Sequence, residues 1–256
     1  MTRLPRLLFH LYKNRRFHLR GTCPVCGRYS AFICKDPQSL RGDLFCFFCR
    51  SSSRNRHIAK ILAQSILPGA KSIKEAVKDS GVRIYNTNAC GSIHRALADS
   101  GYYLCSEYLP EIPFGTMDER GIWSEDLQNL SFGSDNFDYI ITEDVLEHVR
   151  DYRKAFTEIK RVLKSGGKHV FTLPLNICKN TARRVDISRG NDIHVLPPVY
   201  HEDPLNDEGA LVYTDFGRDM LDELEGMKMP TQIRFSEYED KFSGIFNSMV
   251  LISTKQ

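Results

Sequence analysis

The stretch that decides the fold runs from Glu125 to Pro174 and reads EDLQNLSFGSDNFDYIITEDVLEHVRDYRKAFTEIKRVLKSGGKHVFTLP. Its residues 137–142 form a short apolar run of β-branched and aromatic side chains, which is typical of a buried strand. Apolar residues then recur at helical spacing over residues 152–163, and the glycines of residues 164–167 are expected to cap that helix. Residues 170–173 follow as a second strand. Strand, helix and strand in this order predict a βαβ unit, and hence a sheet that is at least partly parallel.

Five short motifs within this stretch resemble those of class I S-adenosylmethionine-dependent methyltransferases. They are Asp126-Leu127-x-x-Leu130-x-Phe132, Asn136-Phe137-Asp138, Leu146-Glu147-His148-Val149, Arg161-Val162-Leu163-Lys164 and Gly166-Gly167. Their order and spacing carry the resemblance, which extends loosely from about Val82 to the C-terminus. It implies an α/β fold with a Rossmann-like, mostly parallel sheet, an antiparallel C-terminal edge strand, and a methyltransferase that uses S-adenosylmethionine. An unrelated α/β domain is the alternative.

Ligands of open α/β sheets bind beyond the carboxyl ends of the strands, which places the expected cofactor site after the first two strands. We expect these strands at residues 82–85 and 102–106. Glu107 then stands at the tip of the second strand, where a carboxylate can accept hydrogen bonds from both ribose hydroxyls. The turn after the first strand contains one glycine, Gly91, where the family has an acidic residue and two or three glycines. The resemblance assigns the cofactor to Asn86, Thr87, Asn88, Ala89, Gly91, Glu107, Asp126, Leu127 and Glu143, with Asp126 near the adenine.

Two Cys-x-x-Cys pairs stand apart from this pattern, near the N-terminus. They are Cys23 with Cys26 and Cys46 with Cys49, at a spacing typical of a zinc ribbon. Four thiolates suit tetrahedral Zn²⁺ and close its coordination shell, so the expected role of this metal is structural. Disulfides are the alternative, but the chain shows no secretory signal and its other cysteines are scattered.

Charge divides the chain sharply. Residues 1–60 have a net charge of +11 and the remainder −8, against +3 for the whole chain. Leucines at helical spacing alternate with basic residues over residues 1–20, which indicates a basic amphipathic helix. Such a segment could bind RNA or an anionic membrane surface, or pack on its own domain. No segment is long and apolar enough to span a bilayer, so we expect a cytoplasmic protein, peripheral to a membrane if this helix binds one.

These features predict four regions. A basic amphipathic segment covers residues 1–20, a zinc ribbon residues 21–52, linking helices residues 53–80, and the class I methyltransferase domain residues 81–256.

Two regions offer a general base for a hydroxyl acceptor. His148 follows the strand of residues 137–142, at the edge where the methyl group should lie. His201 and Asp203 belong to an insertion after the following strand, which we expect to be irregular because it is rich in proline. His201 or Asp203 is the leading candidate, and His148 could equally be a structural residue at a helix start.

The sequence favours O-methylation of a sugar, glycan or other small-molecule hydroxyl. An RNA base methyltransferase of the rRNA type, using the basic ribbon to bind RNA, is the alternative. A degenerate domain that binds a partner but no cofactor is a third possibility, because the first turn is poor in glycine. The sequence does not name the acceptor, the methylated atom or the oligomeric state.

Overall fold

A computed structural model describes residues 18–34, 36, 38–203, 206–236 and 240–256. Contacts group these residues into two compact units, which we describe one at a time. The first unit contains the described residues up to Arg83 together with Asn88–Leu104 and Ile233–Val250. The second contains Ile84–Thr87, Cys105–Gln232 and Leu251–Gln256.

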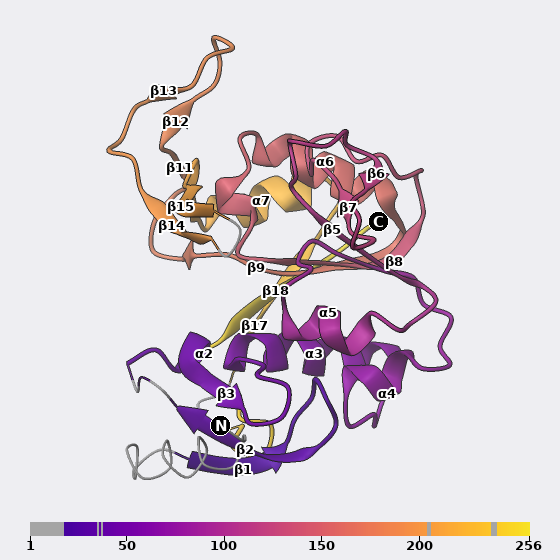
Figure 1. Cartoon of the computed structure of the whole chain (residues 1–256). Coiled ribbons are helices and arrows are strands. Elements are labelled where there is room, and N and C mark those ends of the chain that lie inside the picture. The colour runs from indigo at the N-terminus through magenta and orange to yellow at the C-terminus, as the bar shows by residue number, and fades with distance from the viewer. Residues whose placement is uncertain (1–17, 35, 37, 204–205, 237–239) are drawn as a thin grey trace. The chain divides into compact units, whose positions relative to one another are not determined.

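The first unit opens with a small antiparallel sheet in the order β1-β2-β3 (Figure 1). The strands are β1 (His18–Thr22), β2 (Tyr29–Cys34) and β3 (Leu44–Cys46), and the short helix α2 (Leu40–Asp43) precedes β3. The basic amphipathic helix expected over residues 1–20 falls largely outside the described residues. Its last three residues belong to β1 and are therefore not helical, because they pair with β2 in an antiparallel ladder.

Helices α3 (Ser53–Ile66), α4 (Ile73–Val77) and α5 (Ser92–Leu97) complete the regular elements of the first unit. The N-terminus of α3 is fixed by a reciprocal capping box between Ser52 and Asn55. Arg56, on the same helix, is completely buried. Its guanidinium donates to the carbonyl oxygens of Leu44 at 2.9 Å and Ser243 at 3.1 Å, and also to those of Ser51 and Gly244. Its planar group therefore ties the ribbon to the segment 233–250, which lies almost two hundred residues further along the chain.

The methyltransferase-like sheet contains eight described strands in the order β17-β18-β9-β8-β4-β5-β7-β6. The strands are β4 (Ile84–Asn86), β5 (Tyr103–Glu107), β6 (Thr116–Met117), β7 (Trp123–Ser124), β8 (Phe137–Glu143), β9 (Leu163–Thr172), β17 (Thr231–Phe235) and β18 (Met249–Thr254). The pairs β4–β8, β8–β9 and β5–β7 are parallel, whereas β18 runs antiparallel to β9. A mostly parallel sheet with an antiparallel finish was expected, and this Rossmann-like arrangement is the fold observed. The first two strands begin one or two residues later than the sequence suggested.

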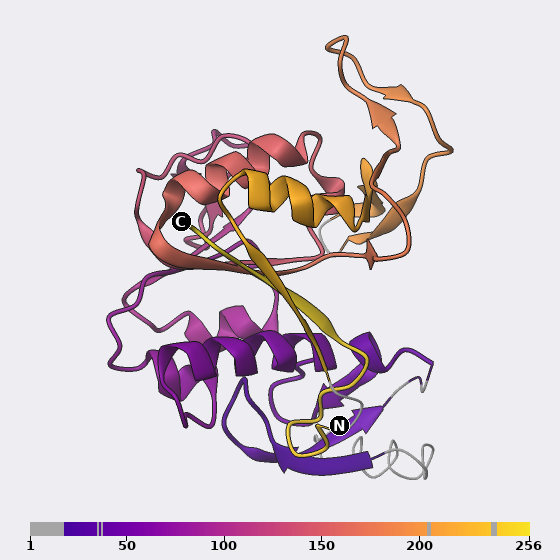
Figure 2. The same cartoon turned by 180° about the vertical axis from the view of Figure 1, so that it is seen from behind.

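Two helices of the second unit lie together on one side of β9, α6 (Tyr152–Val162) and α7 (Asp219–Gly226) (Figures 1 and 2). One face of α6 is buried and carries five apolar residues, Tyr152, Ala155, Phe156, Ile159 and Val162. Glu223 of α7 accepts hydrogen bonds from the hydroxyl of Tyr152 and the guanidinium of Arg153. These hydrogen bonds link α7 to the first turn of α6.

The glycine cap expected at residues 164–167 is wrong. Helix α6 ends at Val162, and the main chain of Leu163 is already extended at the start of β9. The carbonyl groups of the last helical turn accept from the N–H groups of Asp135 and Asn136 instead of from a glycine cap. Gly166 has a φ of +76° and lies in the irregular part of β9, where the register of β9 against β8 shifts.

The insertion after β9 is more regular than its prolines suggested. It forms short strands that pair locally, and part of it extends away from the main sheet (Figure 1). The strands are β10 (Leu175–Asn176), β11 (Ala182–Arg183), β12 (Val185–Asp186), β13 (Ile193–His194), β14 (Tyr200–Asp203), β15 (Asn206–Leu211) and β16 (Thr214–Gly217). Phe216 of β16 pairs with Leu175 of β10, and α7 begins at Asp219. No described helix is long and apolar enough to cross a membrane.

Candidate functional site

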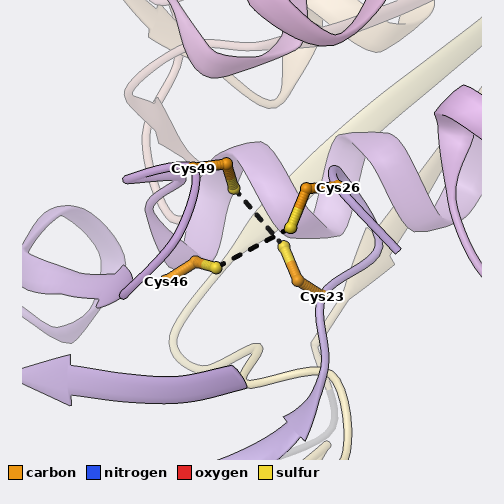
Figure 3. A group of neighbouring side chains, drawn as sticks. All are labelled: Cys23, Cys26, Cys46 and Cys49. Atoms are coloured by element: carbon orange, nitrogen blue, oxygen red, sulfur yellow. Dashed lines mark hydrogen bonds between the residues drawn. The ribbon is translucent and has the colours of Figure 1, made fainter. Parts of the chain in front are cut away.

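The four predicted zinc ligands come together in the first unit. Cys23, Cys26, Cys46 and Cys49 each present a sulfur, and these atoms all lie within 4.8 Å of one another (Figure 3). The Sγ atoms of Cys23 and Cys49 are 3.6 Å apart, and those of Cys26 and Cys46 are 4.0 Å apart. These distances are far too long for a disulfide. Sulfurs at about 2.3 Å from a common tetrahedral centre would stand about 3.8 Å apart, so the cluster has the dimensions of a zinc site.

Both pairs of cysteines are held by the same backbone turn. The N–H of Gly27 donates to the carbonyl of Cys23 at 2.8 Å, and the N–H of Arg50 donates to the carbonyl of Cys46 at 3.0 Å. Gly27 and Arg50 each follow the second cysteine of their pair, and both have positive φ, +73° and +63°. The ligand geometry is therefore built by two matching turns.

Hydrogen bonds among the four sulfurs favour the thiolate form at two of them. Hydrogen bonding from Cys26 lowers the pKa of the Cys23 thiol to about 7, and hydrogen bonding from Cys23 lowers the pKa of the Cys46 thiol. Hydrogen bonding from Cys23 raises the pKa values of the Cys26 and Cys49 thiols. The hydroxyl of Ser51 lies within hydrogen-bonding distance of the sulfurs of Cys23 and Cys49, at 3.4 and 3.2 Å. Thiolates are the form that binds a metal ion.

The expected cofactor residues of the second unit follow the carboxyl ends of adjacent strands. Asn86 ends β4, and the N–H of Thr87 donates to the carbonyl of Ile141 in β8. Glu107 ends β5 and is half-buried, and Glu143 ends β8 and is buried. Since β8, β4 and β5 are neighbours in the sheet, these residues share the edge at which such sheets bind ligands.

Asp126 and Leu127 lie just beyond β7. The carboxylate of Asp126 accepts from the backbone and side-chain N–H groups of Gln128, at 2.9 and 3.0 Å. The side chain of Leu127 is buried. Asp126 is therefore held by its own turn and is only half-buried.

The remaining expected cofactor residues form the turn before α5, in the first unit. The side-chain oxygen of Asn88 accepts from the N–H groups of Cys90 at 3.0 Å and Gly91 at 2.8 Å. Ala89 is half-buried between them, and Gly91 caps α5. An Asn-centred turn thus replaces the glycines that the family pattern would place here.

Two of the candidate bases lie against each other in the second unit. His148 ends a 3-10 turn after β8, η1 (Leu146–His148), and His201 lies in β14. Nδ1 of His201 is 3.2 Å from Nε2 of His148, and the two rings are nearly perpendicular at 87°. The carboxylate oxygen Oε1 of Glu147 lies 3.8 Å from Nε2 of His148 and 3.9 Å from Nδ1 of His201.

The hairpin β14–β15 fixes this arrangement. Nδ1 of His148 lies 2.9 Å from the carbonyl oxygen of Leu211, which can only accept, so this nitrogen carries the proton and Nε2 keeps its lone pair. Gly209, at a φ of +78°, packs against the backbone of His201, and a Cβ there would approach the carbonyl oxygen of His201 to 2.5 Å. The third candidate base, Asp203, ends β14, and its side chain falls outside the described residues.

A cavity of about 450 Å³ adjoins His201. Glu147 and His201 line it, together with polar residues of the insertion that include Lys179, Asn180 and Asp215. Sequence reasoning named neither Glu147 nor these three as site residues. The sequence signal for Glu147 was its position beside His148 in the Leu-Glu-His-Val motif. The positions of the other three residues depend on local strand pairing, which leaves no periodic pattern in the sequence.

Residues 116–171 match the model of a methyltransferase domain. This part of the second unit is therefore similar to a methyltransferase domain. The match spans β6 to β9, and so includes η1 with Glu147 and His148. The chain is thus an enzyme of the methyltransferase class, with the fold of those that use S-adenosylmethionine as methyl donor.

Several solved structures are similar at low identity. A SAM-dependent methyltransferase from Methanosarcina mazei is 17% identical, with 68% of this chain and 92% of that chain covered and a TM-score of 0.39. An S-adenosylmethionine-dependent methyltransferase from Mesorhizobium loti is 16% identical, with coverage of 69% and 91% and a TM-score of 0.43. A possible histamine N-methyltransferase from Thermotoga maritima is 14% identical, with coverage of 80% and 91% and a TM-score of 0.43. None of the curated proteins matches the chain.

Proposed function

We propose that this methyltransferase transfers the methyl group of S-adenosylmethionine to a hydroxyl of a sugar, glycan or other small molecule. The observation that carries the proposal is the pair His148–His201 beside a cavity in the methyltransferase unit. A hydroxyl acceptor must lose a proton, and a positioned imidazole is the commonest group for that task. The donor sulfonium is already activated, so the enzyme otherwise supplies alignment and exclusion of water.

In this proposal S-adenosylmethionine lies at the sheet edge formed by Asn86, Glu107 and Glu143, with Asp126 toward the adenine. The turn containing Asn88 and Gly91 contributes its backbone. The support is positional, because these residues follow neighbouring strands at the ligand-binding edge of the fold.

A structural zinc ion in the four-cysteine cluster is part of the proposal. The spacing of the sulfurs and the lowered pKa of Cys23 support it. With four protein ligands the ion has no open position, so its role is to hold the ribbon and not to act on the acceptor.

RNA is the second candidate acceptor, and one observation favours it. The net charge of +11 in residues 1–60 would attract a phosphate backbone. A basic amphipathic segment also binds an anionic membrane. The charge is therefore shared by two kinds of enzyme, an RNA base methyltransferase and a methyltransferase that works at a membrane surface.

The experiment uses S-adenosylmethionine with a labelled methyl group, the purified chain, and two acceptor sets, small hydroxyl compounds with glycans and total RNA. The proposal expects label in an acid-stable methyl ether that ribonuclease does not release. Label that appears only in methylated bases of RNA would overturn it in favour of the second candidate.

A further inference from the structure

The geometry points to a divalent metal-ion site formed by Glu147, His148 and His201, separate from the four-cysteine cluster. These three residues offer two imidazole nitrogens and one carboxylate oxygen that all lie within 4.8 Å of one another. Two imidazoles with one carboxylate are a donor set that binds Zn²⁺, Mn²⁺ and Fe²⁺.

The three distances fit one ion. The separations of 3.2, 3.8 and 3.9 Å between the donor atoms define a triangle whose corners are all about 2.1 Å from a common point. Metal–nitrogen and metal–carboxylate bonds of first-row ions have this length. The perpendicular rings of His148 and His201 also allow both lone pairs to converge without a clash.

His148 is oriented as a ligand before any ion binds. Its Nδ1–H donates to the carbonyl of Leu211, which leaves Nε2 unprotonated and turned toward Glu147 and His201. A metal-binding histidine generally donates its second nitrogen in this way, which fixes its tautomer and ring orientation. His201 reaches the site with Nδ1 and needs its proton on Nε2 to bind the ion.

Burial explains why an ion would be held tightly. The side chain of Glu147 is 1% exposed, and its Oε1 lies 3.8 and 3.9 Å from the nitrogens of the two imidazoles. A carboxylate is costly to bury, and a divalent cation bound to it would offset that cost.

The ion would keep open positions toward the cavity, because Glu147 and His201 both line it and His201 is partly exposed. Its catalytic role rests on the proposed function. With the ion bound, both imidazoles are ligands and the ion takes over their role as base: a hydroxyl bound to the ion would become more acidic and would lose its proton to water. The oxygen then attacks the methyl carbon: the O–CH₃ bond forms, the S–CH₃ bond breaks, and the sulfur keeps the electron pair as the thioether of S-adenosylhomocysteine.

The test is a titration with Mn²⁺ of the chain that carries one equivalent of zinc, which the four-cysteine cluster takes up, followed by electron paramagnetic resonance in the absence of donor and acceptor. Mn²⁺ is chosen because it prefers nitrogen and oxygen ligands over thiolates. We expect one Mn²⁺ per chain, with hyperfine coupling to two imidazole nitrogens. His201→Ala should weaken binding at least tenfold and leave coupling to one nitrogen, and Glu147→Gln should weaken it comparably.

Glu202→Gln is the matched control, because it removes an exposed carboxylate next to His201 in β14. It should bind Mn²⁺ as the wild-type chain does. Circular dichroism and zinc content establish that each variant is folded. Absence of Mn²⁺ binding in the wild-type chain, or equal binding by His201→Ala, would overturn the site. Because no turnover is measured, a chain that binds Mn²⁺ but methylates no hydroxyl would refute the proposed function and leave the site standing.

Discussion

His201 lies in hydrogen-bonding contact with His148 although 53 positions separate them in the chain. His148 comes from the turn after β8, and His201 comes from the hairpin β14–β15 within the insertion. The sequence offered them as two alternative bases. Because they share one site with Glu147, substitution of either is expected to affect the other, and their effects on catalysis should not add.

The first prediction concerns the four-cysteine cluster. Cys26→Ser should lose about one equivalent of zinc and destabilise the first unit, because three thiolates no longer close a tetrahedral shell. Cys178→Ser is the matched control, since Cys178 is exposed in the other unit. Metal analysis of protein purified without added metal measures both. A fully folded wild-type chain without zinc would contradict the prediction.

The second prediction concerns the donor. Glu107→Ala should remove two charge-assisted hydrogen bonds to the ribose and weaken S-adenosylmethionine binding by roughly 2–4 kcal/mol. Glu111→Ala removes an exposed carboxylate four residues further on and should leave affinity unchanged. Isothermal titration calorimetry gives both affinities. Equal binding by Glu107→Ala and the wild-type chain would show that the ribose lies elsewhere.

The third prediction concerns turnover. Replacing His201 and Asp203 together by alanine should lower the rate by about 10²–10⁴-fold, which is the usual cost of losing a positioned base or its equivalent. Affinity for S-adenosylmethionine should change little, because β14 belongs to the insertion and not to the strands whose ends are proposed to bind the donor. Single-turnover kinetics and calorimetry are the two measurements. Unchanged turnover would assign the proton to His148 or leave alignment alone to drive the reaction.

The fourth prediction concerns His169, which lies fully buried in β9 with Nε2 2.9 Å from the hydroxyl of Thr142. Burial lowers the pKa of His169 from 6.5 to about 3. Above pH 6.5 the ring is neutral in both the folded and the unfolded state, and its full contribution to the free energy of unfolding is present. Between pH 6.5 and 3 the unfolded chain binds one more proton, so the free energy of unfolding falls as the pH is lowered.

The substitution His169→Gln removes the imidazole that binds this additional proton in the unfolded chain. Going from pH 8 to pH 5, the wild-type chain should lose about 2 kcal/mol more stability than the variant. Urea unfolding at both pH values measures the loss, and the pH 8 values serve as the control for altered packing. Parallel pH dependence in the two proteins would mean that His169 becomes charged in the folded state.

Much of the fold could be predicted because its signals are local. The apolar run of β8, the helical spacing of α6 and the cysteine pairs each fix structure within a few residues of themselves. Gly166 and Gly167 misled because the same residue type serves a helix cap and a strand irregularity. A Cβ on Gly167 would approach the carbonyl oxygen of Asp138 in β8 to 3.2 Å, a contact that no helix pattern reveals.

Only half of the candidate site could be predicted from the sequence, for the same reason. His148 belongs to a motif of fixed spacing, but the position of His201 depends on Gly209 and on the pairing of the short strands β14 and β15, which the sequence pattern does not reveal. The Asn88 turn shows the opposite case, since its side-chain bonds to Cys90 and Gly91 follow from local sequence alone.

The buried guanidinium of Arg56 bears on how the protein is made. A chain leaves the ribosome from its N-terminus, and Gly244, which supplies one of its acceptors, emerges 188 residues after it. The hydroxyl of Ser53 donates to the carbonyl oxygen of Phe246, which is synthesised 193 residues later. The ribbon is therefore synthesised first but is among the last parts to complete its buried contacts, and until then the pairing of its own strands β1, β2 and β3 has to hold it together.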